Sequence, residues 1–543
     1  TRRLKLLLGL VIVVAGVRAV DLGVLRSGEL KAQAAQQQAI TSEIPAPRGD
    51  ITDRHGVELA VSQPAVDVSA DPMLVKDPAG LAARLAAILG LPAADLESKL
   101  AQKEKGFIWL ARRVPAAVGD RVRALKIDGI NFAPSMLRAY PRGQQAGQLI
   151  GFVGTEGKGL SGLEYKWDSI LRGSNGKRTM LADPHGQPLG VEVGKRTVPG
   201  KDLRLTIDAA VQDEVERVLA GIGKTYQPKG ATAIVMDPNS GQILALANWP
   251  AVNANDTGSA SPYAQMNRAS GFTYEPGSTF KSFTVASALA ERKVTPDSVF
   301  ELPVVLQVGD KTIKDSHDRG PEALSVSGIL AQSSNVGAAE IGLKVGRKKL
   351  SRWIRRFGFG APTDSGLPGE ERGIVLPLSK YSSATVGNES MGQGLSVTPL
   401  QMVQGYSAIA NGGVLRSPTI VDAIDGKPTG AARGRRILSP RVAAQVRSML
   451  KGVLAEGGTA SGAEIPGFDL AGKTGTAQKV DPDTGTYSTS KYIASFIGFA
   501  PARSPKLLAA VVVDEPNGDI YGGSVAAPAF SRIMAFALPY LCL

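Results

Sequence analysis

Three short strings of residues in this 543-residue chain carry the side chains needed to attack a carbonyl carbon. In chain order they are Ser278-Thr279-Phe280-Lys281, Ser333-Ser334-Asn335 and Lys473-Thr474-Gly475-Thr476. They offer a serine with a lysine one helical turn away, a second hydroxyl with an amide, and a cation followed by two hydroxyls. A serine becomes a good nucleophile when a nearby base accepts its proton, and a neutral amine can be that base. The set predicts attack on a carbonyl that lies next to a free carboxylate.

The surroundings of Ser278 distinguish it from other serines in the same pattern. Ser-x-x-Lys occurs four times, starting at Ser174, Ser278, Ser448 and Ser488. The patterns Ser-x-Asn and Lys-(Ser/Thr)-Gly each occur once. Ser278 alone follows a Pro-Gly pair and begins a run with apolar residues near helical spacing, which places free backbone N–H groups and the positive end of a helix beside it. Ser448 is expected inside a helix, and Ser174 and Ser488 are expected in loops.

Composition excludes several kinds of chemistry. The length predicts two or more domains, and 43% hydrophobic with 20% charged residues is ordinary for a folded protein. Cys542 is the single cysteine, so neither an internal disulfide nor a cysteine-based site is expected. The three histidines are far apart and share no metal-ligand spacing. We therefore predict no metal and no cofactor, and lysine remains as the base for Ser278.

The chain has a net charge of +13, and its basic residues are most concentrated at residues 346–360. Apolar residues in that run recur at i, i+3, i+4 and i+7, which predicts an amphipathic helix with a solvated basic face. No nucleic-acid-binding motif accompanies the charge, so we expect no nucleic-acid partner.

The N-terminus predicts a membrane anchor. Residues 4–25 form an apolar stretch about 33 Å long as a helix, enough to span a bilayer. Arg18 and Asp21 interrupt it, and their spacing allows them to pair on one helix face. Basic residues before the stretch predict a cytoplasmic N-terminus. A cleaved signal peptide is the alternative, but the small-residue site at 32–34 lies too far beyond the apolar run.

Patterns along the chain predict four parts. Residues 1–25 are expected to form a cytoplasmic stub and transmembrane anchor, and residues 26–44 a helical or flexible stalk. Residues 45–200 mix short strands and helices in a non-catalytic pedestal, with helical spacing at residues 81–100. Residues 201–543 begin with a strand and a helix and continue through a β-hairpin at 233–247. They are expected to form an α+β domain.

A phosphate-binding loop is a rival interpretation of the third string. Residues 467–474 match the pattern G-x-x-x-x-G-K-T, which binds phosphates only when a helix follows it. Here a strand pattern follows, then a turn at residues 481–485 and two further apolar segments. These features predict an antiparallel meander, so an ATPase is disfavoured.

Further motifs resemble those of a known family. Residues 48–54 (RGDITDR), 151–154 and 162–164 are similar to N-terminal motifs of class B penicillin-binding proteins. Residues 274–277, 392–394 and 398–401, with the three strings above, resemble the transpeptidase signatures of that family. The resemblance runs from about residue 45 to the end, and it is to the cell-division, FtsI-type branch.

The resemblance implies an elongated pedestal and a C-terminal penicillin-binding domain with a central antiparallel sheet flanked by helices. It implies cross-linking of septal peptidoglycan stem peptides that end in D-Ala-D-Ala, with β-lactams acylating the same serine. It implies five catalytic residues: the nucleophile Ser278, the base Lys281, the proton relay Ser333, the orienting amide Asn335 and the cation Lys473. Three further residues would bind the substrate carboxylate, the oxyanion and an added substrate strand: Thr474, Gly475 and Thr476. Lys281 must be neutral to act, so burial and the charge of Lys473 are expected to lower its pKa.

Partners and alternatives follow from the same resemblance. No glycosyltransferase domain precedes residue 200, so a membrane polymerase of the SEDS family (FtsW-type) and other division proteins are expected partners. The protein is expected in the bacterial inner membrane as a single-pass protein, with its catalytic domain outside the cytoplasm. An elongation-branch transpeptidase, a D,D-carboxypeptidase, a β-lactamase or a silent division scaffold stays open as an alternative.

Overall fold

The structure is a computed structural model that describes residues 2–28, 39–182, 188–317, 319–481 and 483–543. The chain folds into two compact units, which alternate along the sequence. The first contains Thr1–Gly49, Ser62–Arg138 and Arg172–Lys201, and the second contains Asp50–Val61, Ala139–Leu171 and Asp202–Leu543. The domain boundaries expected at residues 25, 44 and 200 remain predictions.

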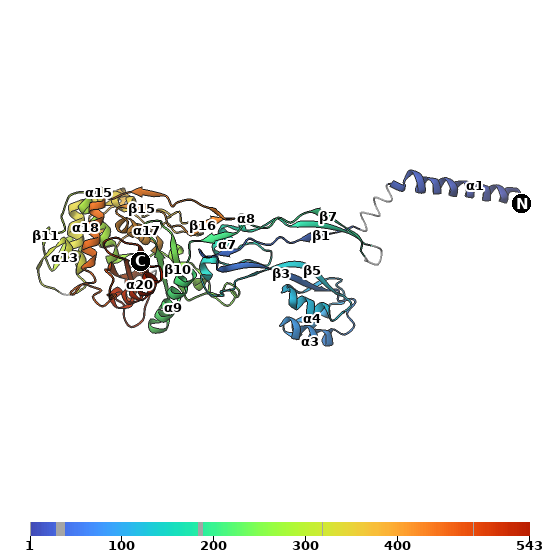
Figure 1. Ribbon diagram of the computed structural model, residues 1–543, viewed down its shortest axis with the longest axis horizontal. Coiled ribbons are helices and arrows are strands. Elements are labelled where there is room, and N and C mark those ends of the chain that lie inside the picture. The colour runs from blue at the N-terminus through green and yellow to red at the C-terminus, as the bar shows by residue number, and fades with distance from the viewer. Residues whose placement is uncertain (1, 29–38, 183–187, 318, 482) are drawn as a thin grey trace. The chain divides into compact units, whose positions relative to one another are not determined.

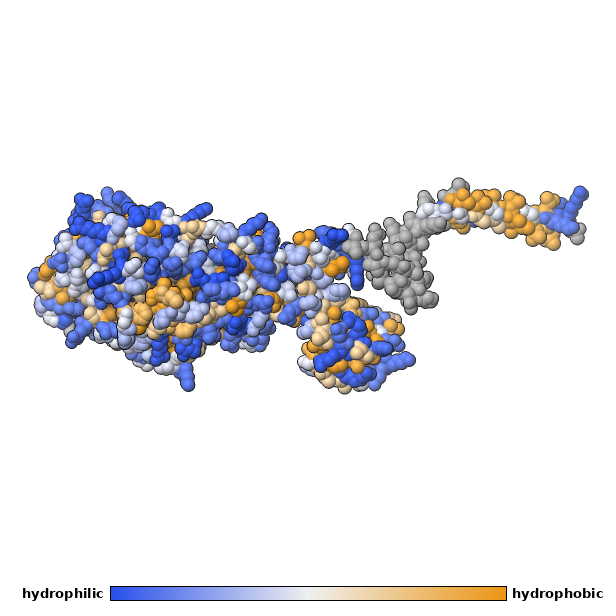
Figure 2. Space-filling model, in the orientation of Figure 1, coloured by the Kyte–Doolittle hydropathy of each residue, from blue (hydrophilic) through white to orange (hydrophobic). Residues whose placement is uncertain are grey.

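The N-terminal segment of the first unit is an apolar helix. Helix α1 (Arg2–Val20) continues into a π-helical turn, η1 (Asp21–Leu25). In the part of the chain that the structure describes, one helical segment, Arg2–Val24, is both long enough and apolar enough to cross a bilayer. None of this segment is buried. Figure 2 shows the hydrophobic surface of this helix and the hydrophilic surface at its N-terminal end. Arg18 Nη1 donates to Asp21 Oδ2 at 2.8 Å, which confirms the expected pairing of these charges.

The expected stalk at residues 26–44 is wrong in part. Ala39–Ile44 forms strand β1, which pairs antiparallel with β6 (Gly176–Ala182), and β6 pairs with β7 (Pro188–Lys195). The partner strand lies more than 130 residues away in the sequence, so no local pattern could reveal the pairing. The stalk residues 29–38 lie outside the described residues.

The rest of the first unit packs two helices and a small sheet around its own core. Helices α3 (Pro78–Leu89) and α4 (Ala93–Leu100) confirm the helical spacing expected at residues 81–100, and they bury leucines from both helices. Strand β3 (Glu58–Ala70) pairs with β4 (Ile108–Pro115). The remaining elements are α5 (Ala116–Arg123) and β5 (Ile130–Ala139).

The second unit is built on a five-stranded antiparallel sheet with the strand order β10-β9-β21-β20-β19. Figure 1 labels β10 together with the helices α9, α17, α18 and α20 of this unit. Every residue of β9 and β21 is buried, so helices must cover both faces of the sheet. Helices α9 and α20 pack on each other and on the sheet, and α17 and α18 form a second group that contacts it. This arrangement confirms the predicted α+β domain and its hairpin. The bounds are β9 (Gly230–Met236), β10 (Ile243–Trp249), β19 (Ala471–Val480), β20 (Tyr487–Ala500), β21 (Leu507–Asp514), α9 (Ala209–Tyr226), α17 (Pro399–Ala410), α18 (Pro440–Lys451) and α20 (Ala527–Tyr540).

Strand β19 is the edge strand of this sheet and carries the third string. It leads through a turn into β20, which pairs antiparallel with both β19 and β21. A phosphate loop requires a helix directly after its lysine, and Lys473 instead lies inside a strand. The phosphate-loop interpretation is therefore excluded.

Other sequence expectations have mixed outcomes. Helix α15 (Arg347–Arg356) buries Leu350, Trp353 and Ile354, as expected for the amphipathic run. Ser448 lies inside α18, as predicted, but Ser488 lies in strand β20 and not in a loop.

The second unit contains a number of shorter elements, several of which contact the sheet or the helices above. Its other helices are α6 (Gly147–Ile150), α7 (Gly162–Lys166), α8 (Asp168–Leu171), α10 (Pro262–Gln265), α11 (Arg268–Gly271), α13 (Val326–Ala331), η3 (Leu378–Lys380), α16 (Thr385–Ser390) and α19 (Gly522–Val525). Its other strands are β2 (Ile51–Thr52), β8 (Leu203–Leu205), β11 (Val299–Leu302), β12 (Val305–Val308), β13 (Lys311–Lys314), β14 (Glu322–Ser325), β15 (Val414–Arg416), β16 (Val421–Ile424), β17 (Lys427–Pro428) and β18 (Gly434–Arg436).

Candidate active site

Ser278 lies in a single 3-10 turn, η2 (Gly277–Phe280), which runs directly into helix α12 (Lys281–Ala290). Gly277 has a positive φ of 53°, and its N–H donates to Gly392 O at 3.0 Å. A Cβ on Gly392 would lie 2.1 Å from Gly277 O, so this close approach requires glycine. Ser278 is half-buried between buried neighbours. The expected helix start is confirmed, and its first turn is tighter than an α-helix.

The buried core fixes the turn and the helix behind it. The ring of Phe280 lies 5.2 Å from that of Phe283 and 5.1 Å from that of Phe359. Tyr406 Oη donates to Thr279 O at 2.7 Å. Aromatic packing and a buried hydrogen bond on the residues that flank Ser278 leave Ser278 little freedom to move.

Lys281 joins the first string to the second. Its Nζ donates to Ser333 O at 2.6 Å and to Asn335 Oδ1 at 2.6 Å, and it lies 3.3 Å from Ser333 Oγ. The side chain is buried, with 1% of its surface exposed. Ser333 and Asn335 stand at the start of helix α14 (Asn335–Val345), which Ser334 caps through a bond from Gly337 N. Two segments more than 50 residues apart therefore meet at one amine.

Burial lowers the pKa of Lys281 to about 7. The negative charge of Asp315 opposes this shift by raising the pKa, and the positive charge of Arg319 lowers the pKa by a smaller amount. Burial was one of the two expected causes of the lowered pKa. The other, the charge of Lys473, is not among the causes that act on Lys281, whereas Asp315 and Arg319, which do act on it, were not singled out from the sequence. Burial also lowers the pKa of Lys473 well below its usual range, and the charge of Lys281 adds to this effect. Because the two amines repel each other in a dry environment, they cannot both hold a proton at low cost near neutral pH.

The third string lies along the exposed edge of the sheet, next to the turn that carries Ser278. Lys473 is fully buried, and its Nζ donates to Thr474 Oγ1 at 3.2 Å. Thr474 Oγ1 also lies 2.6 Å from Thr459 Oγ1, a residue without any sequence signal. Thr476 Oγ1 accepts a hydrogen bond from Gly522 N at 3.1 Å. The two threonine hydroxyls are thus held in place beside η2.

Gly475 is required for a reason that the sequence did not reveal. A Cβ there would lie 2.4 Å from Ser495 Oγ, 3.0 Å from Thr279 Cγ2 and 3.1 Å from Pro276 O. The absent side chain therefore makes room for the turn of Ser278 and for strand β20. The expected substrate strand along Gly475 stays a prediction.

Glu275 connects three segments around the site, although the sequence placed it only in a family motif. Its Oε1 accepts from Gly394 N at 2.9 Å, and its Oε2 accepts from Tyr487 Oη at 2.8 Å. Burial raises the pKa of Glu275. The Gly392–Gly394 segment was likewise identified from the sequence only as a family motif. The hydrogen bond from Gly394 N to Glu275 holds it against the segment that precedes Ser278.

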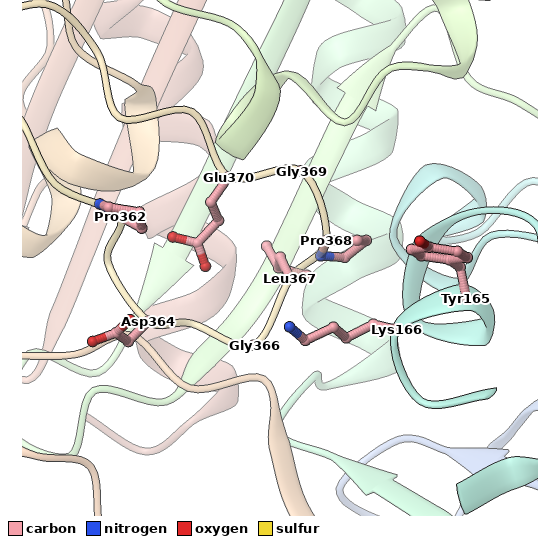
Figure 3. A pocket seen from close by; sticks show the side chains of 9 residues that line it. All are labelled: Tyr165, Lys166, Pro362, Asp364, Gly366, Leu367, Pro368, Gly369 and Glu370. Carbon is pink, nitrogen blue, oxygen red and sulfur yellow. The ribbon is translucent and has the colours of Figure 1, made fainter. Parts of the chain in front are cut away.

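A pocket of about 500 Å³ lies away from these residues in the second unit (Figure 3). Tyr165 and Lys166 of α7 face the loop of residues 362–370 across it. Glu370 accepts hydrogen bonds from Thr363 and Ser365, so its carboxylate is already occupied. None of the eight predicted site residues lines this pocket, and the pocket adds nothing to the site.

Comparisons with known proteins agree with this geometry. Residues 231–535 match the penicillin binding protein transpeptidase domain, and residues 43–205 match the penicillin-binding protein dimerisation domain. The chain is 34% identical over 518 residues to the probable peptidoglycan D,D-transpeptidase PenA of Neisseria meningitidis, covering 94% of this chain and 87% of that protein. It is 34% identical over 521 residues to the peptidoglycan D,D-transpeptidase FtsI of Escherichia coli strain K12, covering 95% and 86% respectively.

Solved structures give the same result. Penicillin binding protein 3 from Mycobacterium tuberculosis, complexed with aztreonam, superposes with a TM-score of 0.74 at 28% identity over 92% of this chain and 98% of that one. The transpeptidase match covers more than half of the chain, and both relatives exceed 30% identity over most of their length. The chain therefore belongs to the class B penicillin-binding proteins.

Proposed function

We propose that this protein is a peptidoglycan D,D-transpeptidase of the cell-division branch, which cross-links stem peptides through an acyl-enzyme on Ser278. The observation that carries the proposal is the state of Lys281. It is a buried amine with a pKa near 7, three residues from a half-buried serine and bonded to the Ser-x-Asn string. A lysine in that state can accept a proton at neutral pH, as the attack of a serine requires.

The hydrogen bonds of Lys281 explain how its lone pair stays available. Ser333 O and Asn335 Oδ1 can only accept hydrogen bonds, so each takes one N–H of a neutral amine. The remaining lone pair then accepts the proton of Ser278 Oγ as this oxygen bonds to the carbonyl carbon. Ser333 Oγ, 3.3 Å from Nζ, lies in position to return a proton to the leaving D-Ala amine.

The edge strand supplies the binding half of the site. We assign the substrate carboxylate to the hydroxyls of Thr474 and Thr476, and the oxyanion to the backbone N–H groups of Ser278 and Thr476. A carboxylate next to Lys473 favours the protonated form of this lysine, so binding of substrate restores the cation that burial disfavours. The peptide would add to β19 as a further strand.

The activity is tested with a pentapeptide donor ending in D-Ala-D-Ala, followed with and without an amine acceptor by mass spectrometry. We expect the acceptor to divert the acyl group from hydrolysis to a cross-linked product, because amine and water compete for one acyl-enzyme. D-Ala release with no cross-linked product at any acceptor concentration would identify a D,D-carboxypeptidase.

Acylation by a β-lactam is expected to depend on pH through Lys281. Below a pH of about 7 the amine holds a proton and cannot accept that of Ser278, so the acylation rate constant should fall about tenfold per pH unit. Above that pH the rate should level off. Stopped-flow acylation from pH 5 to 9 measures this profile, and a flat profile across pH 6–8 would contradict the assignment of the base.

The remaining assignments concern location and partners. We assign α1 to a single-pass anchor in the inner membrane with its basic end in the cytoplasm, which places the transpeptidase domain outside. Residues 45–200 and 201–543 are assigned as pedestal and transpeptidase domain. A SEDS-family polymerase of the FtsW type and other division proteins are the proposed partners.

A further inference from the structure

The turn that presents Ser333 and Asn335 has an unusual backbone. Ser333 has a φ of 62°, a left-handed conformation that costs free energy for any residue with a side chain. Such a conformation persists only when surrounding bonds hold it. The bonds on this turn therefore show what keeps two site residues in place.

Asp315 accepts three of these bonds, all from residues that directly follow Ser333. Its Oδ2 accepts from Ser334 Oγ at 3.0 Å, and its Oδ1 accepts from the N–H groups of Asn335 and Val336, the latter at 3.2 Å. Its side chain is only 6% exposed. A buried carboxylate that accepts two N–H groups at the start of the 11-residue helix α14 is also favoured by the positive end of that helix.

Lys314, the residue before Asp315, also binds Asn335. Lys314 O, at the end of β13, accepts from Asn335 Nδ2 at 3.0 Å. This bond uses the amide nitrogen and leaves the amide oxygen directed at Lys281 Nζ. The orientation of Asn335 is thus decided by the segment that carries Asp315.

The same carboxylate is the anion that acts on Lys281. Among the described residues, Asp315 and Arg319 of the segment after β13 carry the charges that act on this amine, and the amine in turn acts on Lys473 of β19. Arg319 Nε lies 3.4 Å from Asp315 Oδ2, and its Nη1 bonds to Glu322 of β14. Asp315 favours the protonated amine, so it opposes the effects of burial and of Arg319 on Lys281.

We propose that Asp315 is a positioning residue of this site, which fixes the turn of Ser333 and Asn335 and sets the electrostatic potential at Lys281 Nζ. The inference rests on the proposed function, because it concerns the base of that reaction. Asp315 lies outside all three motif strings, and no side-chain atom of it is assigned to the substrate.

Full-length protein carrying Asp315→Asn tests the proposal in the acylation assay from pH 5 to 9. Asparagine keeps the size of the side chain and removes its charge. The acid limb of the profile should therefore move to lower pH by about 1 unit, since an amine without its nearby anion loses its proton more readily. The plateau rate should fall about tenfold while the apparent dissociation constant for the β-lactam changes little, because the turn is held less firmly. Asp315→Glu, which restores the charge, should return the acid limb toward that of the wild type.

Arg319→Gln gives an independent test with the opposite sign. Removing this cation should move the acid limb to higher pH, and it remains informative if Asp315→Asn does not fold. Asp77→Asn, at the exposed N-cap of α3, is the matched control for loss of a capping carboxylate and should leave the profile unchanged.

The outcomes separate the two claims. A lower thermal unfolding midpoint with an unmoved acid limb would reduce Asp315 to a structural cap and overturn the inference. An Asp315→Asn shift to higher pH, or an Arg319→Gln shift to lower pH, would overturn it as well. Failure of the wild type to form an acyl-enzyme would instead overturn the proposed function.

Discussion

Replacing Ser278 with alanine is expected to lower covalent labelling by a fluorescent penicillin by about 10⁴-fold or more, to the limit of detection. In the proposed mechanism the acyl bond forms on Ser278 Oγ, and no rearrangement of the buried turn is expected to supply another hydroxyl at that position. Gel fluorescence and intact-protein mass spectrometry measure the loss of the adduct. The fold should persist, since Ser278 is half-buried and its backbone is fixed by Gly277 and Thr279.

Ser448→Ala is the matched control for this experiment. Ser448 has the same spacing to a lysine, but it lies exposed on helix α18, and it should label like the wild type. Equal labelling of the Ser278 variant and the wild type would show that another nucleophile reacts. An adduct that persists on the Ser278 variant and disappears with the Ser448 variant would reverse the assignment.

Lys281→Met has the second largest expected effect. Methionine fills a similar volume without an amine, so acylation should fall by about 10²–10⁴-fold, the usual contribution of a general base. The residual rate should also lose its change near pH 7, because the group with that pKa is gone. Rapid-mixing acylation at several pH values measures both effects, and thermal unfolding reports whether the buried site remains folded.

Lys451→Met is the control for loss of a lysine from a Ser-x-x-Lys string. Lys451 pairs with Asp469 at 2.9 Å on the surface and should change acylation by less than about twofold. A Lys281→Met protein that keeps the acid limb near pH 7 would mean that another group acts as the base. The pH profile of Asp315→Asn distinguishes the two roles, because this variant should shift the acid limb of the acylation profile, whereas Lys281→Met should abolish it.

Local sequence patterns correctly predicted the helices and strands that form from residues close together in the chain. The helix after Ser278, the hairpin at residues 233–247 and the strand at Lys473 all follow from periodicity and turn residues. The three strings could be grouped because each carries a distinct functional group. Placement of β19 at a sheet edge beside η2 agrees with that grouping, although the distances could come only from the fold.

The features that were missed depend on contacts between distant segments. Strand β1 pairs with residues 176–181, and Ser488 joins a strand whose polar end has no alternating pattern. Asp315 belongs to no string, and its role appears only when β13 lies against the start of α14. The close contact of Gly277 with Gly392 is likewise invisible in either string alone.

The open edge of β19 has a consequence for solubility. An unpaired strand edge is a template on which any extended chain can add, and it is a common starting point for aggregation. The proposed reaction requires this edge to stay open, so no further strand can cover it. A bulge between Gln478 and Val480 interrupts the pairing of β19 with β20, and Lys479 Nζ donates to Asp514 Oδ1 at 2.7 Å. A bulge and a charged residue both disfavour the addition of a foreign strand, so they leave the stretch of β19 beside Ser278 as the regular part of the open edge.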